Sequence, residues 1–158
     1  MPNVAHLLNT PMDDPSLQIP LTPVGTWSGE LIKITYRDKD RDGEPLEDKN
    51  GDNYAMVRLI VRPSTPQEDV TDKKAVKAFL DAGGPEETVL SLSKFVRGKR
   101  DVSRLNRLLA SLGVPVAGRS ISAVAEEFSG GVPCLFEVEH GEYNGEPTEE
   151  VGAIYPAE

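Results

Sequence analysis

The sequence has little of what catalytic and metal centres are usually built from. It contains one cysteine, Cys134, and two histidines, His6 and His140. One cysteine excludes an intrachain disulfide framework and provides no metal-ligand spacing, so we interpret Cys134 as a small buried apolar side chain. No Ser-His-Asp or Cys-His arrangement follows from the spacing of these residues. We therefore expect no enzymatic activity, no cofactor and no metal site.

The acidic residues offer one alternative to that interpretation. Paired carboxylates hold the metal ions of two-metal nucleases, and glutamates are frequent between Glu137 and Glu150. In this sequence they alternate or cluster as the acids on a solvated hairpin surface do. We interpret them as such a surface.

Long hydrophobic segments are also missing. No apolar run approaches the roughly 20 residues that a membrane helix requires. Residues 1–10 lack the charged start and the long apolar middle of a signal peptide. We therefore expect a cytoplasmic protein with no membrane partner.

The formal net charge of −9 argues at first against a nucleic-acid partner, because phosphate contacts need lysine and arginine. The charges are unevenly distributed, however. Residues 94–107 contain six basic residues and the single acid Asp101, whereas residues 108–158 contain nine glutamates and the single basic residue Arg119. A compact basic stretch inside an acidic chain is typical of single-strand binders, which combine a positive groove with repulsion elsewhere.

The chain length fits one domain, and 14 glycines and 13 prolines indicate many turns and short elements. Residues 1–23 contain five prolines and no clear periodicity, so we expect an extended or partly ordered N-terminal arm. Its apolar residues are candidates for docking on the domain or on a second copy, which makes a homo-oligomer a candidate assembly. Residues 24–158 form the expected domain.

Alternating patterns and turn residues predict five strands in that domain. The predicted strands span residues 27–36, 54–62, 88–96, 133–140 and 148–155. Asn144-Gly145 separates the last two, and this pair predicts a hairpin because both residues accept a positive φ.

Three helices are predicted between the strands. A small one follows a cap at Thr71 or Asp72, and carries Val76, Phe79 and Leu80 on one face. The main one follows a cap at Asp101 or Ser103, and a short one spans residues 120–128. The main helix then lies between strands three and four, and the small helical insertion between strands two and three. This order predicts a five-stranded OB-fold barrel, in the all-β/α+β class.

In OB-folds, nucleic acid lies across strands two and three. The second predicted strand alternates between an apolar face suited to a core and a face that carries Tyr54, Arg58 and Arg62. The third strand and its exit add Lys94, Phe95, Arg97, Lys99 and Arg100. Bases stack on aromatic rings while cations follow the phosphates, so this combination predicts a single-strand site. The alternative is that Phe95 belongs to the core and the arginines form a solvated surface where the helix begins.

The polar segment between the first two strands has two interpretations. Residues 38–43 match the first six positions of a calcium loop. The match fails at the twelfth position, where Lys49 replaces the bidentate glutamate, and Pro45 replaces the usual apolar residue. We therefore predict a flexible loop whose basic members, among them Arg41, close on DNA. Tyr36, at the mouth of this loop, is a further candidate for stacking, whereas Trp27 is expected in the core.

Two runs of residues resemble a known family. Residues 94–100, Lys-Phe-Val-Arg-Gly-Lys-Arg, lead into residues 104–113, Arg-Leu-Asn-Arg-Leu-Leu-Ala-Ser-Leu-Gly. Together with residues 118–120, 136–138, 142–145 and 154–156, they resemble phage-encoded OB-fold single-stranded-DNA-binding proteins. The resemblance implies binding to single-stranded DNA in phage DNA replication or recombination, in the host cell cytoplasm, without enzymatic activity. Replication or recombination proteins are then candidate partners.

The chain also departs from that family. Many single-strand binders end in an acidic tail tipped by an aromatic residue, whereas this chain ends Ile-Tyr-Pro-Ala-Glu. Partner recruitment through the C-terminus is therefore not expected. The competing hypothesis is an OB-like protein-interaction or virion structural module that binds no nucleic acid. The acidic excess and the proline-rich arm favour that alternative.

Overall fold

The computed structural model describes residues 4–157, so the first three residues of the expected arm and Glu158 lie outside the described residues. The centre of the fold is a five-stranded antiparallel sheet with the order β3-β2-β1-β4-β5. Its strands are β1 (Gly25–Arg37), β2 (Ala55–Pro66), β3 (Leu90–Val96), β4 (Val132–Tyr143) and β5 (Glu146–Pro156). The strand number and the α+β class are confirmed. The sheet is not closed by hydrogen bonds, although β3 and β5 at its two edges lie close to each other.

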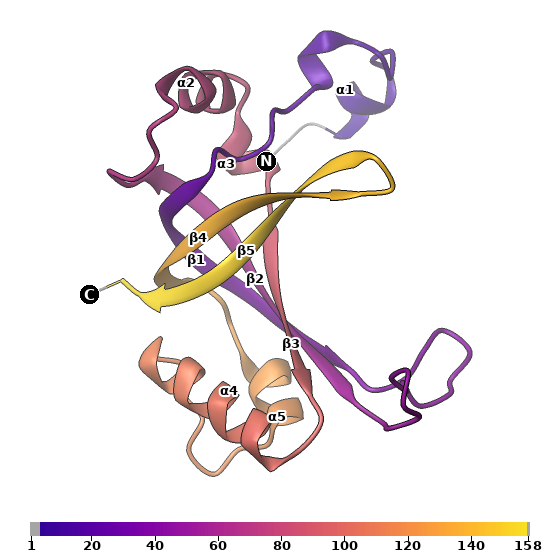
Figure 1. The fold of residues 1–158 in the computed structure, drawn as a ribbon. Coiled ribbons are helices and arrows are strands. Elements are labelled where there is room, and N and C mark those ends of the chain that lie inside the picture. Colours follow the sequence, from indigo (N-terminus) through magenta and orange to yellow (C-terminus); the bar gives the residue numbers. More distant parts are fainter. Residues whose placement is uncertain (1–3, 158) are drawn as a thin grey trace.

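Helices gather at the two ends of this sheet (Figure 1). α2 (Lys73–Asp81) and α3 (Gly84–Glu87) connect β2 to β3, and α4 (Lys99–Ser111) and α5 (Ile121–Glu127) connect β3 to β4. The first pair lies at one end and the second pair at the other. A main helix before β4 and a helical insertion before β3 are therefore confirmed. No helix within residues 4–157 combines the length and the apolar character needed to cross a membrane.

Alternation along β2 shapes the core. Val57, Leu59 and Val61 are buried, as the sequence predicts. Trp27 is also buried, and its ring meets that of Phe79 from α2 edge-on, with centroids 5.4 Å apart. The indole N–H donates to the Pro23 carbonyl at 2.9 Å, which satisfies the polar atom of this buried side chain.

The helix boundaries differ in part from those predicted. Asp72 caps α2 by accepting the Ala75 N–H at 3.0 Å, as expected. Leu80, however, is exposed, since its position in α2 faces away from the core. α4 begins at Lys99, after Gly98, and is not capped by Asp101 or Ser103. Asp101 lies inside the first turn, where its carboxylate accepts the Arg97 N–H at 2.9 Å.

The closing hairpin forms at the predicted turn. Asn144 and Gly145 have φ values of 52° and 82° and separate β4 from β5. Two successive residues with positive φ give the backbone twist that suits a two-residue hairpin loop. Both strands extend further than the sequence pattern indicates, because residues 141–143 and 146–147 carry no regular alternation of apolar and polar side chains.

The N-terminal segment is partly helical. It contains α1 (Val4–Leu8) and a short 3₁₀ turn, η1 (Pro15–Leu17). Thr22 fixes its end to the β4–β5 hairpin, because its N–H donates to a Glu149 carboxylate oxygen at 2.5 Å and its carbonyl lies 2.6 Å from Nε2 of His140. Ile19 packs against the core. The arm is thus anchored where it meets the domain.

Candidate nucleic-acid interface

Side chains from three strands share one solvent-facing side of the sheet, which we call the outer face. Residues directly opposite each other in antiparallel strands point to the same side. Three such rows cross β1, β2 and β3 in that order: Arg37–Met56–Phe95, Thr35–Arg58–Ser93 and Lys33–Ile60–Ser91. All of these residues are exposed or half-buried. The outer face is therefore open to a ligand.

An aromatic and guanidinium cluster lies at one end of the outer face. The rings of Tyr54 and Phe95 meet edge-on, with centroids 5.7 Å apart. The guanidinium carbon of Arg97 lies 5.3 Å from the centroid of Phe95 and 5.8 Å from that of Tyr54. Phe95 is 44% exposed, although it is apolar. Phe95 is therefore not part of the buried core, and its stacking on a base stays a prediction.

The loop before β2 consists of two similar turns. An aspartate Oδ1 accepts two backbone N–H bonds in each turn, from Asp42 and Glu44 at Asp40, and from Asn50 and Asp52 at Asp48. The shared pattern, Asp-basic-Asp/Asn-Gly-acid, starts at residue 40 and again at residue 48. Such turns are set by the aspartate side chain itself. The structure therefore gives the predicted flexible loop a defined turn geometry.

The second of these turns reaches the aromatic cluster. Oδ2 of Asp48 lies 3.8 Å from Nε of Arg97. Arg41 belongs to the first turn, which extends beyond the end of the sheet in Figure 1. Among residues 4–157, no group of three or more His, Cys, Asp or Glu side chains could hold a metal ion. The likeness of residues 38–43 to a calcium loop is thus not accompanied by a ligand cluster.

The structure brings together some of the predicted site residues. Tyr54, Arg58, Phe95 and Arg97 lie on or beside the outer face, and Arg62 lies on the same side opposite Glu30 of β1. These residues combine ring faces and exposed cations. Their joint position follows from the β2–β3 register.

Other predicted residues lie elsewhere. Tyr36, Val57 and Lys94 form one row across the strands, and Val57 is buried, so Tyr36 and Lys94 belong to the side that faces the helices. The Tyr36 hydroxyl donates to Glu126 of α5 at 3.1 Å, which raises the pKa of Tyr36 above its ordinary value. Tyr36 therefore does not belong to the rows of the outer face, and its stacking on a base stays a prediction.

The basic stretch after β3 is divided between two surfaces. Arg97 lies over the aromatic rings, whereas Lys99 and Arg100 begin α4. Lys99 borders a cavity between α4 and α5. Arg97, Lys99 and Arg100 are near neighbours in the sequence, but the chain turns at Gly98, so they lie on different surfaces.

Two cations of the outer face are absent from the predicted site. Lys33 and Arg37 pair with Ile60 and Met56 and are exposed. The alternation Lys33-Thr35-Arg37 at the end of β1 was the sequence signal that could have placed both cations on one face. A register shift between Leu31 and Lys33 interrupts the alternation earlier in the strand, so the pattern is not regular along the whole of β1.

The outer face is positive in a chain of negative net charge. It carries Lys33, Arg37, Arg58, Arg62 and Arg97, with Glu30 and Asp48 as the acids beside it. A surface of this kind suits a ligand with planar rings and regularly spaced negative charges. In comparisons with known proteins, no family model matches the sequence, and no curated protein matches it significantly.

Proposed function

We propose that the protein binds single-stranded DNA on the outer face, without strong sequence preference and without chemistry. The observation that carries this proposal is the cluster of Tyr54, Phe95 and Arg97 on an open strand surface. Stacking of a base on an aromatic ring is tolerant of sequence, because every base has a π-face, and contributes about 1–3 kcal/mol. Arg37 lies in the same row as Phe95 and Arg58 in the next row, where the phosphates of a bound strand would pass.

We also propose that the sheet is an OB-fold barrel. The order β3-β2-β1-β4-β5 becomes a closed ring if β3 pairs with β5, and these edge strands lie close together. The position of α4 between β3 and β4 also supports this assignment. In such a barrel, strands two and three carry the ligand, and these are the strands that carry the aromatic cluster.

The biological setting of the proposal rests on the resemblance described above. The residues from Lys94 to Gly113 are similar to a segment of phage single-stranded-DNA-binding proteins. We therefore place the activity in phage DNA replication or recombination in the host cytoplasm, with proteins of those processes as partners. The competing function, a protein-interaction or virion module, is favoured by the acidic total charge and by the exposed apolar residues of the N-terminal segment.

Fluorescence anisotropy with a labelled oligo-dT tests the DNA proposal. We expect binding that weakens with salt, with a slope of log K against log salt of about −2 to −3.5, because three to five cations meet phosphates at roughly 0.7 each. Phe95→Ala should weaken binding by about fivefold or more, since one stacked base is lost. Lys77→Ala, which removes an exposed cation from α2, is the matched control.

Duplex DNA and RNA oligomers of the same length complete the experiment. Weaker binding to the duplex is expected, because paired bases cannot stack on Phe95 and Tyr54. Failure to bind oligo-dT, or binding that is equal in wild type and Phe95→Ala, would overturn the proposal in favour of the protein-interaction module.

A further inference from the structure

The N-terminal segment exposes several apolar side chains close together. Val4, Leu7, Leu8 and Met12 are all exposed, and Leu8 and Met12 are 79% and 95% exposed. Hydrogen bonds within the segment give it shape, including those from Asn9 and Thr10 back to α1. Apolar side chains that gather on an exposed surface mark an interaction site.

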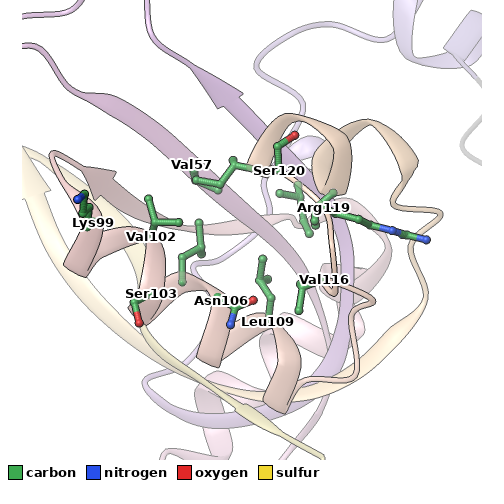
Figure 2. Close-up of a pocket in the computed structure, with 13 residues that line it drawn as sticks. Val57, Lys99, Val102, Ser103, Asn106, Leu109, Val116, Arg119 and Ser120 are labelled. Atoms are coloured by element: carbon green, nitrogen blue, oxygen red, sulfur yellow. The ribbon is translucent and has the colours of Figure 1, made fainter.

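An apolar cavity lies between α4 and α5, over the ends of β1 and β2. Its volume is about 360 Å³, which is within the usual range of ligand pockets. Its apolar lining includes Ile34, Val57, Val102, Leu105, Leu109, Val116, Ile121 and Val124. Figure 2 shows Val102, Ser103 and Asn106 on α4 at one side of the cavity, and Val116 and Ser120 on the other. The cavity therefore has an apolar floor and a polar rim.

The charges around the two features are of opposite sign. Residues 4–18 contain Asp13 and Asp14 and no lysine or arginine. α4 carries Lys99, Arg100, Arg104 and Arg107 against the single acid Asp101, and Lys99 borders the cavity. Arg119, on the opposite side of the opening in Figure 2, is paired with Glu127 at 3.1 Å. An apolar segment followed by two acids thus complements an apolar cavity beside a basic helix.

The segment and the cavity lie at opposite ends of one molecule. In Figure 1, α1 lies at the end of the sheet that carries α2 and α3, whereas α4 and α5 lie at the other end. The anchor at Thr22 holds the base of the segment against the β4–β5 hairpin. An intramolecular contact would require the segment to run along the whole sheet, whereas a second molecule can present its cavity directly.

We infer that residues 4–14 dock into the α4–α5 cavity of a second copy of this chain. Leu8 and Met12 supply the apolar contacts, and Asp13 and Asp14 lie beside the basic residues of α4. The contact joins two different surfaces, so it is heterologous and builds head-to-tail assemblies that grow with concentration. It does not involve the outer face, so it stands or fails independently of DNA binding.

Sedimentation velocity of the full chain in the absence of DNA tests this inference. Wild type should shift from monomer to larger species as its concentration rises. The double variant Leu8→Ser/Met12→Ser should raise the dissociation constant by about a hundredfold, because two apolar side chains lose their burial. Val102→Asp, in the cavity wall, should have a similar effect.

Two matched controls accompany these variants. Val89→Ser changes an exposed apolar residue outside the segment, and Ala110→Asp adds an acid to α4 away from the cavity. Both should associate as wild type does. Thermal unfolding of each variant confirms that the fold is kept, which is expected because all five substituted residues are exposed.

Mixing the variants gives the sharpest result. The double variant Leu8→Ser/Met12→Ser keeps an intact cavity, and Val102→Asp keeps an intact N-terminal segment. Together they should form a one-to-one complex that grows no further, although each alone is monomeric. A wild type that stays monomeric at all concentrations, or a mixture that forms no complex, would overturn the inference.

Discussion

The carboxylate of Asp48 approaches to 3.8 Å from Nε of Arg97, the residue whose guanidinium lies over the rings of Phe95 and Tyr54. Asp48 thus lies on one side of the Arg97 guanidinium, which is the cation best placed to contact a phosphate. Only Oδ2 faces Arg97, because Oδ1 accepts the N–H groups of Asn50 and Asp52 and holds the turn.

Asp48→Asn should therefore increase the affinity for oligo-dT. The amide keeps an oxygen for the turn and removes the charge that competes with phosphate for Arg97. The expected gain is about 1.4-fold to fivefold, since an exposed ion pair contributes roughly 0.2–1 kcal/mol. Anisotropy titration at low salt measures it.

Asp40→Asn is the control for that change. Asp40 forms the same turn with Asp42 and Glu44 but takes part in none of the ion pairs within residues 4–157. It removes the same charge from the same loop. Equal gains from both variants would show a general charge effect and would contradict a specific role of Asp48.

The cations that the sequence interpretation omitted provide a second prediction. Arg37→Ala and Lys33→Ala should each weaken binding and lower the salt slope by about 0.7, because each removes one phosphate contact. Lys94→Ala should change neither quantity, since Lys94 shares a row with the buried Val57 on the other side of β3. An effect of Lys94→Ala equal to that of Arg37→Ala would contradict the proposed site, because it would show that DNA contacts the side of the sheet opposite the outer face.

The site residues show what a linear pattern can predict. Alternation along residues 54–62 is regular, so it assigned Val57 and Arg58 to opposite faces correctly. Lys94 was misplaced for another reason. The alternation along residues 88–96 puts it on the side of Leu90 and Leu92, but the predicted site grouped it with Phe95 by its charge. The contact of Asp48 with Arg97 joins residues 49 positions apart, and no local pattern encodes it.

The fold was predictable for a similar reason. Five strands, the hairpin at Asn144-Gly145 and the main helix each have a local signal, and all three are present. Helix starts were less predictable, because Gly98 gives no side-chain cap and Asp101 accepts a bond from inside the first turn. The separation of Arg97 from Lys99 depends on that boundary.

Gly84→Ala should destabilise the fold. A Cβ at this position would fall on the ring of Phe79, which packs against Trp27 in the core. The expected cost is about 1–3 kcal/mol in the free energy of unfolding, as for other overpacked cores, measured by chemical denaturation. Gly98→Ala is the control, because a Cβ there meets nothing within 4 Å. A loss of similar size at Gly98 would contradict this account.

Cys134 should be unreactive in the folded protein. Its thiol is buried, and burial raises its pKa to about 11. At pH 8 it is therefore protonated, and thiolate is the reactive form. A chromogenic disulfide reagent should label it only after denaturation. Rapid, complete labelling of the native protein would show that β4 opens readily.

The pH dependence of stability should include a contribution from Asp69. Its carboxylate accepts bonds from the Thr26 hydroxyl at 2.7 Å and the Thr26 N–H at 2.9 Å, which lower its pKa below the ordinary value. A lowered pKa means that the stabilisation is complete above the unfolded value near 3.9 and declines as pH falls through the folded value. The difference in unfolding free energy between wild type and Asp69→Asn should shrink on acidification. It should stay below about 1 kcal/mol, because the carboxylate is exposed to solvent. A difference independent of pH between roughly 5 and 2 would contradict it.

The burial of the single tryptophan has a practical consequence for spectroscopy. Trp27 has no solvent-accessible surface and donates its N–H to the Pro23 carbonyl. Its fluorescence emission, excited at wavelengths that only the indole absorbs, therefore reports whether the core is folded. A ligand on the outer face should leave that emission nearly constant while it changes the signal of Tyr54. The chain therefore carries separate fluorescence reporters for unfolding and for ligand binding. One titration followed at two excitation wavelengths can distinguish ligand-bound protein from unfolded protein.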